Sequence, residues 1–274
     1  MIRSIRIQPA KALYVLASLL VLSAVPAHAQ NNTDQPGSDS ELWRMGAYGG
    51  TQWIDYDADM AGLPGVPTCC PRYRGGTGSG LSFGVSVEAP IVNNVYGGFR
   101  LLYTGYEGTV SAEEYELVTS ERDTTTATFG HTIEMSQPVF ATEATFSVAV
   151  LPQLRVQAGA RVDVMLGGTY RQQERIITPD NIRFENGLRT RMMYDGTLPR
   201  EAPTHLAVTA GVRYDFPLNE DHSLMLSPEV QIWQGFEDLI LGTDLTMRGL
   251  RVGLNLYYIT RSERTPSPLD PGRD

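Results

Sequence analysis

"LSFGVSVEA", residues 81–89, is the stretch that decides the fold. Every second position in it is apolar: Leu81, Phe83, Val85, Val87 and Ala89. The positions between them hold serine, glycine and glutamate. Because successive side chains of a β-strand point to opposite faces, this pattern predicts a strand with one apolar face and one small or polar face.

The same two-residue period recurs in seven other segments. These are residues 43–53, 96–106, 140–150, 154–166, 205–216, 222–233 and 250–258. Short connections such as "LPQ" and "PLNED" alternate along the chain with longer ones, which is typical of barrels in the outer membrane. We therefore predict an all-β fold, an eight-stranded antiparallel up-and-down transmembrane β-barrel with long extracellular loops and short periplasmic turns.

A soluble periplasmic lipocalin-like calyx is the alternative, because its strands alternate in the same way with the apolar side chains pointing inward. The unequal connections favour the membrane barrel. The last strand favours it too, since its polar, glycine, hydrophobic and aromatic residues resemble the terminal-strand signal that barrel-assembly machinery reads. Its positions are Arg251, Gly253, Leu256 and Tyr258.

The first 29 residues have the order of a secretory signal peptide. Basic residues precede the apolar run 12–25, and Ala27-His28-Ala29 follows it. The run is shorter than the ~20 residues that span a bilayer, so we expect cleavage near Ala29 and not a membrane anchor. The expected organisation is a signal peptide at 1–29, a flexible segment at 30–42, the barrel at 43–261 and a short proline-rich periplasmic tail at 262–274. This organisation predicts the outer membrane of a Gram-negative bacterium.

The mature chain is acidic. The full sequence has 22 Lys and Arg against 31 Asp and Glu, which gives a net charge of −9. Cleavage of the signal peptide would remove three basic residues and no acidic ones, which leaves a net charge of −12. Such a charge argues against nucleic acid as a partner. We expect the partners to be outer-membrane lipid and, during biogenesis, periplasmic chaperones and the barrel-assembly machinery, and we expect a monomer.

Charged residues occupy the parity opposite the apolar one, which faces the lumen of a membrane barrel. An eight-stranded barrel is only wide enough to be filled by side chains, so charges inside it must be paired. Arginine suits this place because its planar group can bond two carboxylates. The predicted lumen charge network is Glu88, Arg100, Glu143, Arg161, Asp163, Arg213, Glu229 and Arg251, with Arg44 and Asp215 on the same parity. The alternative is that several of them lie at the rims in water, where ion pairs contribute ~0 to 1 kcal/mol.

Aromatic residues on the lipid parity fit interfacial girdles. They are Trp43, Trp53, Tyr214, Phe216 and Tyr258.

Three histidines remain in the mature chain: His131 in the second long connection, His205 at the start of a strand and His222 in a periplasmic turn. Their spacing does not tie them together, and a histidine without a positioned nucleophile is a weak sign of catalysis. We expect no catalytic residues, no cofactor and no metal site. The alternative is a lipid-modifying barrel enzyme that uses His131.

Cys69 and Cys70 are adjacent in "LPGVPTCCPRYRGGTGSG", residues 63–80, which we place in the first external loop. Export makes a disulfide permissible, and a vicinal disulfide would stiffen this turn. Two free cysteines, or a bridge to another molecule, are the alternatives because adjacent cysteines strain the bond.

The chain resembles the OmpA-like outer-membrane β-barrel proteins of Bacteroidota and their relatives over its whole mature length. The double-cysteine loop at 63–80 and the closing strand "TMRGLRVGLNLYY" carry this resemblance. It implies a non-enzymatic integral barrel that serves envelope structure, surface interaction or narrow-pore activity. Related proteins often continue into a peptidoglycan-binding domain, but only 16 residues follow Tyr258 here, so the anchoring role is not expected.

Overall fold

The computed structural model describes residues 40–68, 72–92, 94–120 and 123–262. The signal peptide, most of the segment at 30–42, the tail from residue 263 and the cysteine pair lie outside the described residues. In the part of the chain that is described, no helix is long and apolar enough to cross a membrane.

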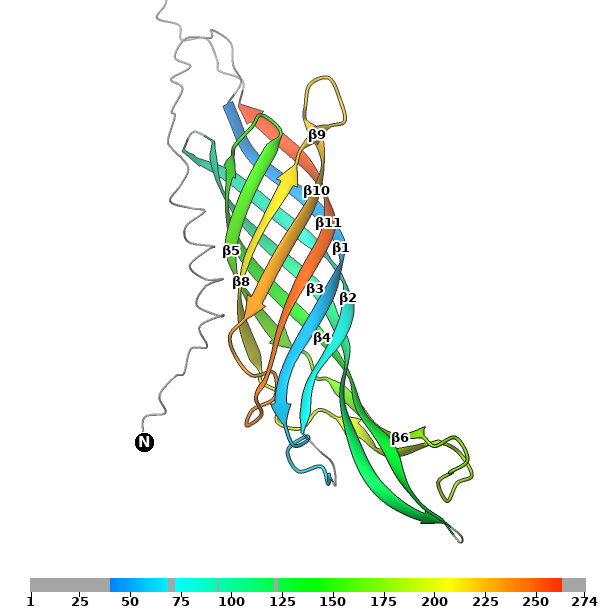
Figure 1. The fold of residues 1–274 in the computed structure, drawn as a ribbon. Coiled ribbons are helices and arrows are strands. Elements are labelled where there is room, and N and C mark those ends of the chain that lie inside the picture. Colours follow the sequence, from blue (N-terminus) through cyan, green and yellow to red (C-terminus); the bar gives the residue numbers. More distant parts are fainter. Residues whose placement is uncertain (1–39, 69–71, 93, 121–122, 263–274) are drawn as a thin grey trace, which may run out of the picture. The chain divides into compact units, whose positions relative to one another are not determined.

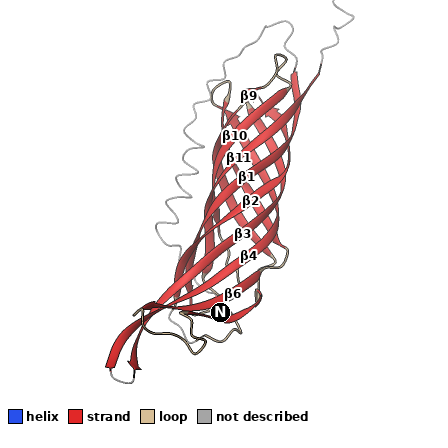
Figure 2. Cartoon of the chain, turned by 90° about the vertical axis from the view of Figure 1, so that its right-hand side faces the viewer, coloured by secondary structure: helices blue, strands red, loops and turns tan. Residues whose placement is uncertain are grey.

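Eight antiparallel strands form a closed ring (Figures 1 and 2). They are β1 (Ser40–Met60), β2 (Tyr73–Val92), β3 (Val95–Ser120), β4 (Asp123–Ala149), β5 (Leu154–Met165), β8 (Thr204–Tyr214), β10 (Leu224–Gly235) and β11 (Leu245–Ser262). Ring neighbours follow chain order, and β1 pairs with β11 to close the barrel. The predicted eight-stranded up-and-down barrel is confirmed.

The strands are staggered around the ring. A row of paired residues that starts at Arg44 on β1 and crosses every strand returns to β1 at Ile54, ten residues (54 − 44) farther from the periplasmic end. Such a stagger goes with strands tilted by about 35–45° from the barrel axis.

The faces of β2 follow the alternation in its sequence. Leu81, Phe83 and Val85 are 71%, 58% and 58% exposed on the outside, whereas Ser82 and Glu88 are buried on the inside. The apolar side chains therefore point outward to lipid, and the calyx arrangement with its apolar interior is wrong.

Two of the expected long loops are largely strand. β3 and β4 have 26 and 27 residues and pair from the periplasmic turn up to Ser120 and Asp123. β6 (Thr169–Thr178) pairs with the upper part of β4, and β7 (Thr190–Thr197) pairs with β6. We call the sheet formed by residues 107–120, residues 123–138, β6 and β7 the outer sheet; it continues beyond the barrel at its extracellular end (Figure 1).

The outer sheet follows from its composition. Residues 109–120 and 123–135 are rich in threonine, which favours strands, and most of their exposed positions hold threonine, serine or glutamate, with Tyr115 and Leu117 as the large apolar exceptions. The expectation of a loop was wrong because it relied on apolar alternation. The structure also starts β1 at Ser40, inside the expected flexible segment at 30–42. A last short strand, β9 (Phe216–Pro217), pairs with β10.

Candidate functional site

The lumen of the ring is filled with charged side chains. Six arginines and five carboxylates lie inside, and each is at most 4% exposed. They are Arg44, Glu88, Arg100, Glu143, Arg155, Arg161, Asp163, Arg213, Asp215, Glu229 and Arg251. We call this set the charged layer.

The middle of the charged layer is built around Arg100 on β3. Arg100 donates two hydrogen bonds to Glu229, at 2.8 and 2.9 Å, and its Nη1 lies 3.8 Å from Glu143. Glu143 also accepts hydrogen bonds from Arg251, at 2.5 Å, and from Gln231, at 2.7 Å. Two carboxylates and two arginines thus neutralise one another across the lumen.

Nearer the periplasmic end, Asp215 forms ion pairs with two arginines. Arg44 and Arg155 each donate to its carboxylate at 2.7 Å, and Ser227 donates at 2.8 Å. The ring of Tyr96 lies 4.9 and 4.0 Å from the two guanidinium carbons, within the range of cation–π attraction.

Arg213 and Glu88 form a second pair at this level. Arg213 donates two hydrogen bonds to the Glu88 carboxylate and one to the Tyr257 hydroxyl, and that hydroxyl donates to Glu88 at 3.0 Å.

At the extracellular side of the layer, Asp163 accepts hydrogen bonds from Arg161 and Tyr106, both at 2.6 Å. His205 Nδ1 lies 3.7 Å from the same carboxylate. Trp233 stacks on Tyr106, with ring centroids 5.8 Å apart, and covers the pair.

The structure brings all eight residues of the predicted lumen network together, along with Arg44 and Asp215. Sequence reasoning missed Arg155, although it shares the parity of Arg161 and Asp163 on the same strand. Buried ions cost several kcal/mol each unless they are paired, and the ion pairs within the charged layer supply that compensation.

An apolar cap lies above the charged layer. Side chains from three loops, Leu63, Leu198, Leu239 and Ile240, are buried in one cluster with apolar lumen residues of the upper strands. Two of these loops are bonded to each other. Ala202 N–H donates to the Leu239 carbonyl at 3.0 Å and Leu241 N–H to the Arg200 carbonyl at 2.8 Å. The cap was not predicted, although the apolar "DLILG" at 238–242 was a sign of it.

At the rim beside the cap, Arg72 connects the two ends of the first loop. It donates to the Asp59 carboxylate at 2.6 Å and to the Asp59 carbonyl at 2.8 Å. The hydrogen bond from Arg72 lowers the pKa of the Asp59 carboxyl below its usual range.

The outer face of the ring carries an apolar band between two aromatic levels. Trp43 and Tyr258 lie at the periplasmic level and Trp53 at the extracellular one, each more than half exposed. Tyr214 and Phe216 are also exposed and contact each other, with ring centroids 4.5 Å apart. The chain is a transmembrane β-barrel of the outer-membrane type.

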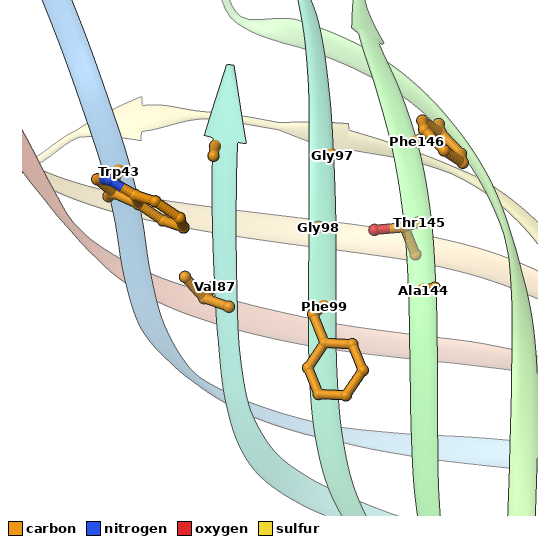
Figure 3. A pocket seen from close by; sticks show the side chains of 9 residues that line it. Trp43, Val87, Gly97, Gly98, Phe99, Ala144, Thr145 and Phe146 are labelled. Atoms are coloured by element: carbon orange, nitrogen blue, oxygen red, sulfur yellow. The ribbon is translucent and has the colours of Figure 1, made fainter. Parts of the chain in front are cut away.

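A shallow hollow of about 280 Å³ lies in this band beside Trp43 (Figure 3). It forms where Ala89, Gly97 and Ala144 leave little side chain between the rings of Phe99 and Phe146. Its lining is largely apolar.

Comparisons with known proteins give distant structural likenesses only. No family model matches the chain, and no curated protein matches it. Among solved structures, the Neisserial surface protein A is 11% identical, covers 81% of this chain and 98% of its own, and has a TM-score of 0.32. The outer membrane protein OprG from Pseudomonas aeruginosa is 11% identical, covers 81% of this chain and 98% of its own, and has a TM-score of 0.33. The outer membrane protease OmpT from Escherichia coli is 8% identical, covers 83% of this chain and 99% of its own, and has a TM-score of 0.35.

The histidines of this barrel lie in separate places. His131 is buried within β4, not in a loop as expected, and its Nε2 lies 3.3 Å from Glu114. His205 shares a row with Asp163 and Ala141, so ten residues of β4 (141 − 131), or about 33 Å of strand, separate the two levels. His222 occupies a turn at the periplasmic end, with φ 54°. No group of three His, Cys, Asp or Glu in the described ranges is arranged to hold a metal.

Proposed function

We propose that this chain is a non-enzymatic integral protein of the Gram-negative outer membrane that acts through its extracellular surface. The export signal, cleaved near Ala29, would deliver it to the periplasm, where chaperones and the assembly machinery would receive it. The lumen is filled by paired charges and covered by an apolar cap, while β3 and β4 continue past the barrel into the outer sheet. A barrel that is closed inside and elaborated outside is best suited to surface interaction.

Narrow-pore activity has less support. Solute crossing the lumen would have to separate Arg100 from Glu229 and displace Leu239 and Ile240 from the cap. Separating a buried ion pair leaves uncompensated charges and costs about 3–5 kcal/mol, which opposes steady permeation.

Catalysis also has less support. A reaction centre needs a nucleophile, a base and an orienting group within hydrogen-bond reach of one another. His131 and His205 lie at levels about 33 Å apart along β4, so they do not act as one centre. The alternative enzyme would alter the mass of lipid A on expression, and we expect no such change, with or without His131→Ala.

Digestion of intact cells with trypsin tests the proposed surface role. Arg183 is exposed in the connection between β6 and β7, in the outer sheet. We expect trypsin added outside to cut there while the rest of the barrel stays in the membrane. The variant Arg183→Gln should lose that cut and serves as the control. Protection of Arg183 in intact cells, with cutting only after lysis, would contradict the surface role.

A further inference from the structure

The outer sheet has two free edges at opposite ends. β7 pairs with β6 and with no other described strand. β3 loses its partner β2 after the pair Gly75–Ser111, so residues 112–119 pair only with β4 among the described strands. Free edges present unpaired N–H and C=O groups, which are templates for pairing with another chain.

The membrane fixes how two copies can meet at these edges. All copies stand the same way up, β3 runs away from the membrane and β7 runs back toward it. β7 beside β3 of a neighbour is therefore antiparallel. β3 beside β3, or β7 beside β7, would be parallel, which is slightly less stable per residue.

The stagger of the barrel sets the register of such a contact. The barrel has a stagger of ten residues over eight strands, which corresponds to a stagger of five residues over four strands. Four strands is the step from β3 of one copy, across β4, β6 and β7, to β3 of the next copy. Paired residues must lie on the same face of the sheet, so the shift in register must be an even number of residues. Four is one of the two even numbers nearest to five. Within one copy Thr190 shares a row with Glu113, and Thr197 with Glu107. A shift of four places residues 190–196 against residues 112–117 of the neighbour, which begin directly after Ser111, the last β3 residue paired with β2.

The spacing also fits. Four strands about 4.8 Å apart and tilted by about 40° advance roughly 25 Å along the membrane, comparable to the outer width of an eight-stranded barrel with its side chains. Neighbouring barrels can therefore stand side by side while their outer sheets join.

Side chains at this register are mostly complementary. Arg191 falls opposite Glu116 on one face, and Met192 falls opposite Tyr115 on the other, where both are more than half exposed. Apolar and opposite-charge pairs across strands are favourable. Asp195 falls opposite Glu113, an unfavourable pair that offsets part of this gain.

We propose that copies of this chain associate in the outer membrane by antiparallel pairing of residues 190–196 of β7 in one copy with residues 112–117 of the next. The contact uses different edges on its two sides, so it does not close on itself and produces rows. This inference rests on the proposed surface role and departs from the monomer expected from the sequence.

Crosslinking between engineered cysteines tests the pairing. The variant Tyr115→Cys/Met192→Cys, in a background with Cys69→Ser and Cys70→Ser, is expressed, and outer membranes are treated with a short bis-maleimide. We expect a ladder of dimers, trimers and larger species. Each single variant should stay monomeric, and the two single variants expressed together should give dimers only. Adding Glu116→Arg should weaken the ladder several-fold.

Three results would overturn the pairing: no ladder from the folded double variant, dimers from Tyr115→Cys alone, or adducts to a different protein in place of the ladder. Heat-modifiable migration on gels shows that a variant has folded. If this variant does not fold, Leu117→Cys/Thr190→Cys tests the same register. Trypsin cutting at Arg183 on the same cells separates the two proposals, because a cut without a ladder rejects the rows and leaves the surface role standing.

Discussion

Replacing Arg100 with alanine is expected to lower the free energy of unfolding by about 3–5 kcal/mol. Arg100 donates two hydrogen bonds to Glu229 and lies near Glu143, and all three side chains are almost completely buried. Without the guanidinium, two carboxylates remain in the lumen with less positive charge beside them. Urea titration of the protein folded in detergent measures the loss.

Arg248 provides a matched control. It pairs with Asp55 on the outer surface, where its side chain is 58% exposed, so Arg248→Ala should cost only about 0–1 kcal/mol. Removing both central charges, in Arg100→Met/Glu229→Gln, should recover part of the stability lost in Arg100→Ala. A loss from Arg100→Ala no larger than that from Arg248→Ala would contradict the structural role of the charged layer.

Replacing Gly253 with valine is expected to destabilise the barrel by about 1–3 kcal/mol or more, because it overfills the lumen. A Cβ at Gly253 would lie 2.2–2.5 Å from atoms of the Tyr48 side chain, which packs across this position from β1. The fraction that migrates as the compact form on unheated gels, together with urea titration, measures the effect.

The same variant separates packing from recognition. Gly253 belongs to the predicted terminal-strand signal, whose residues Arg251 and Gly253 face the lumen while Leu256 and Tyr258 face lipid. If packing is the cause, Gly253→Val should cost little in a Tyr48→Ala background, where the clash is absent. An equal loss in both backgrounds would show that the assembly machinery, and not the Tyr48 ring, requires the glycine.

Alternation predicted the ring and its charged interior because every ring strand has one face in lipid and the other in a narrow lumen. Ser82 and Glu88 lie inside and Leu81 lies outside, as the period requires. The same rule applied to the whole of β5 would also have included Arg155.

The outer sheet and the apolar cap escaped prediction for a different reason. Above the barrel, threonine, serine and glutamate fill most of the exposed positions of β3 and β4, so the regular apolar alternation that marks a membrane strand is missing there. The cap depends on contacts between loops far apart in sequence, such as Leu63 and Leu239, and local patterns hold no information on such pairs.

Ion conductance through the purified protein in planar lipid bilayers tests the central claim most directly, that the lumen is closed and the functional surface lies outside. We expect no discrete current steps above the bare membrane at high salt, because paired charges fill the ring and the cap covers it. Steady, reproducible open-channel steps from the folded wild-type protein would contradict the account.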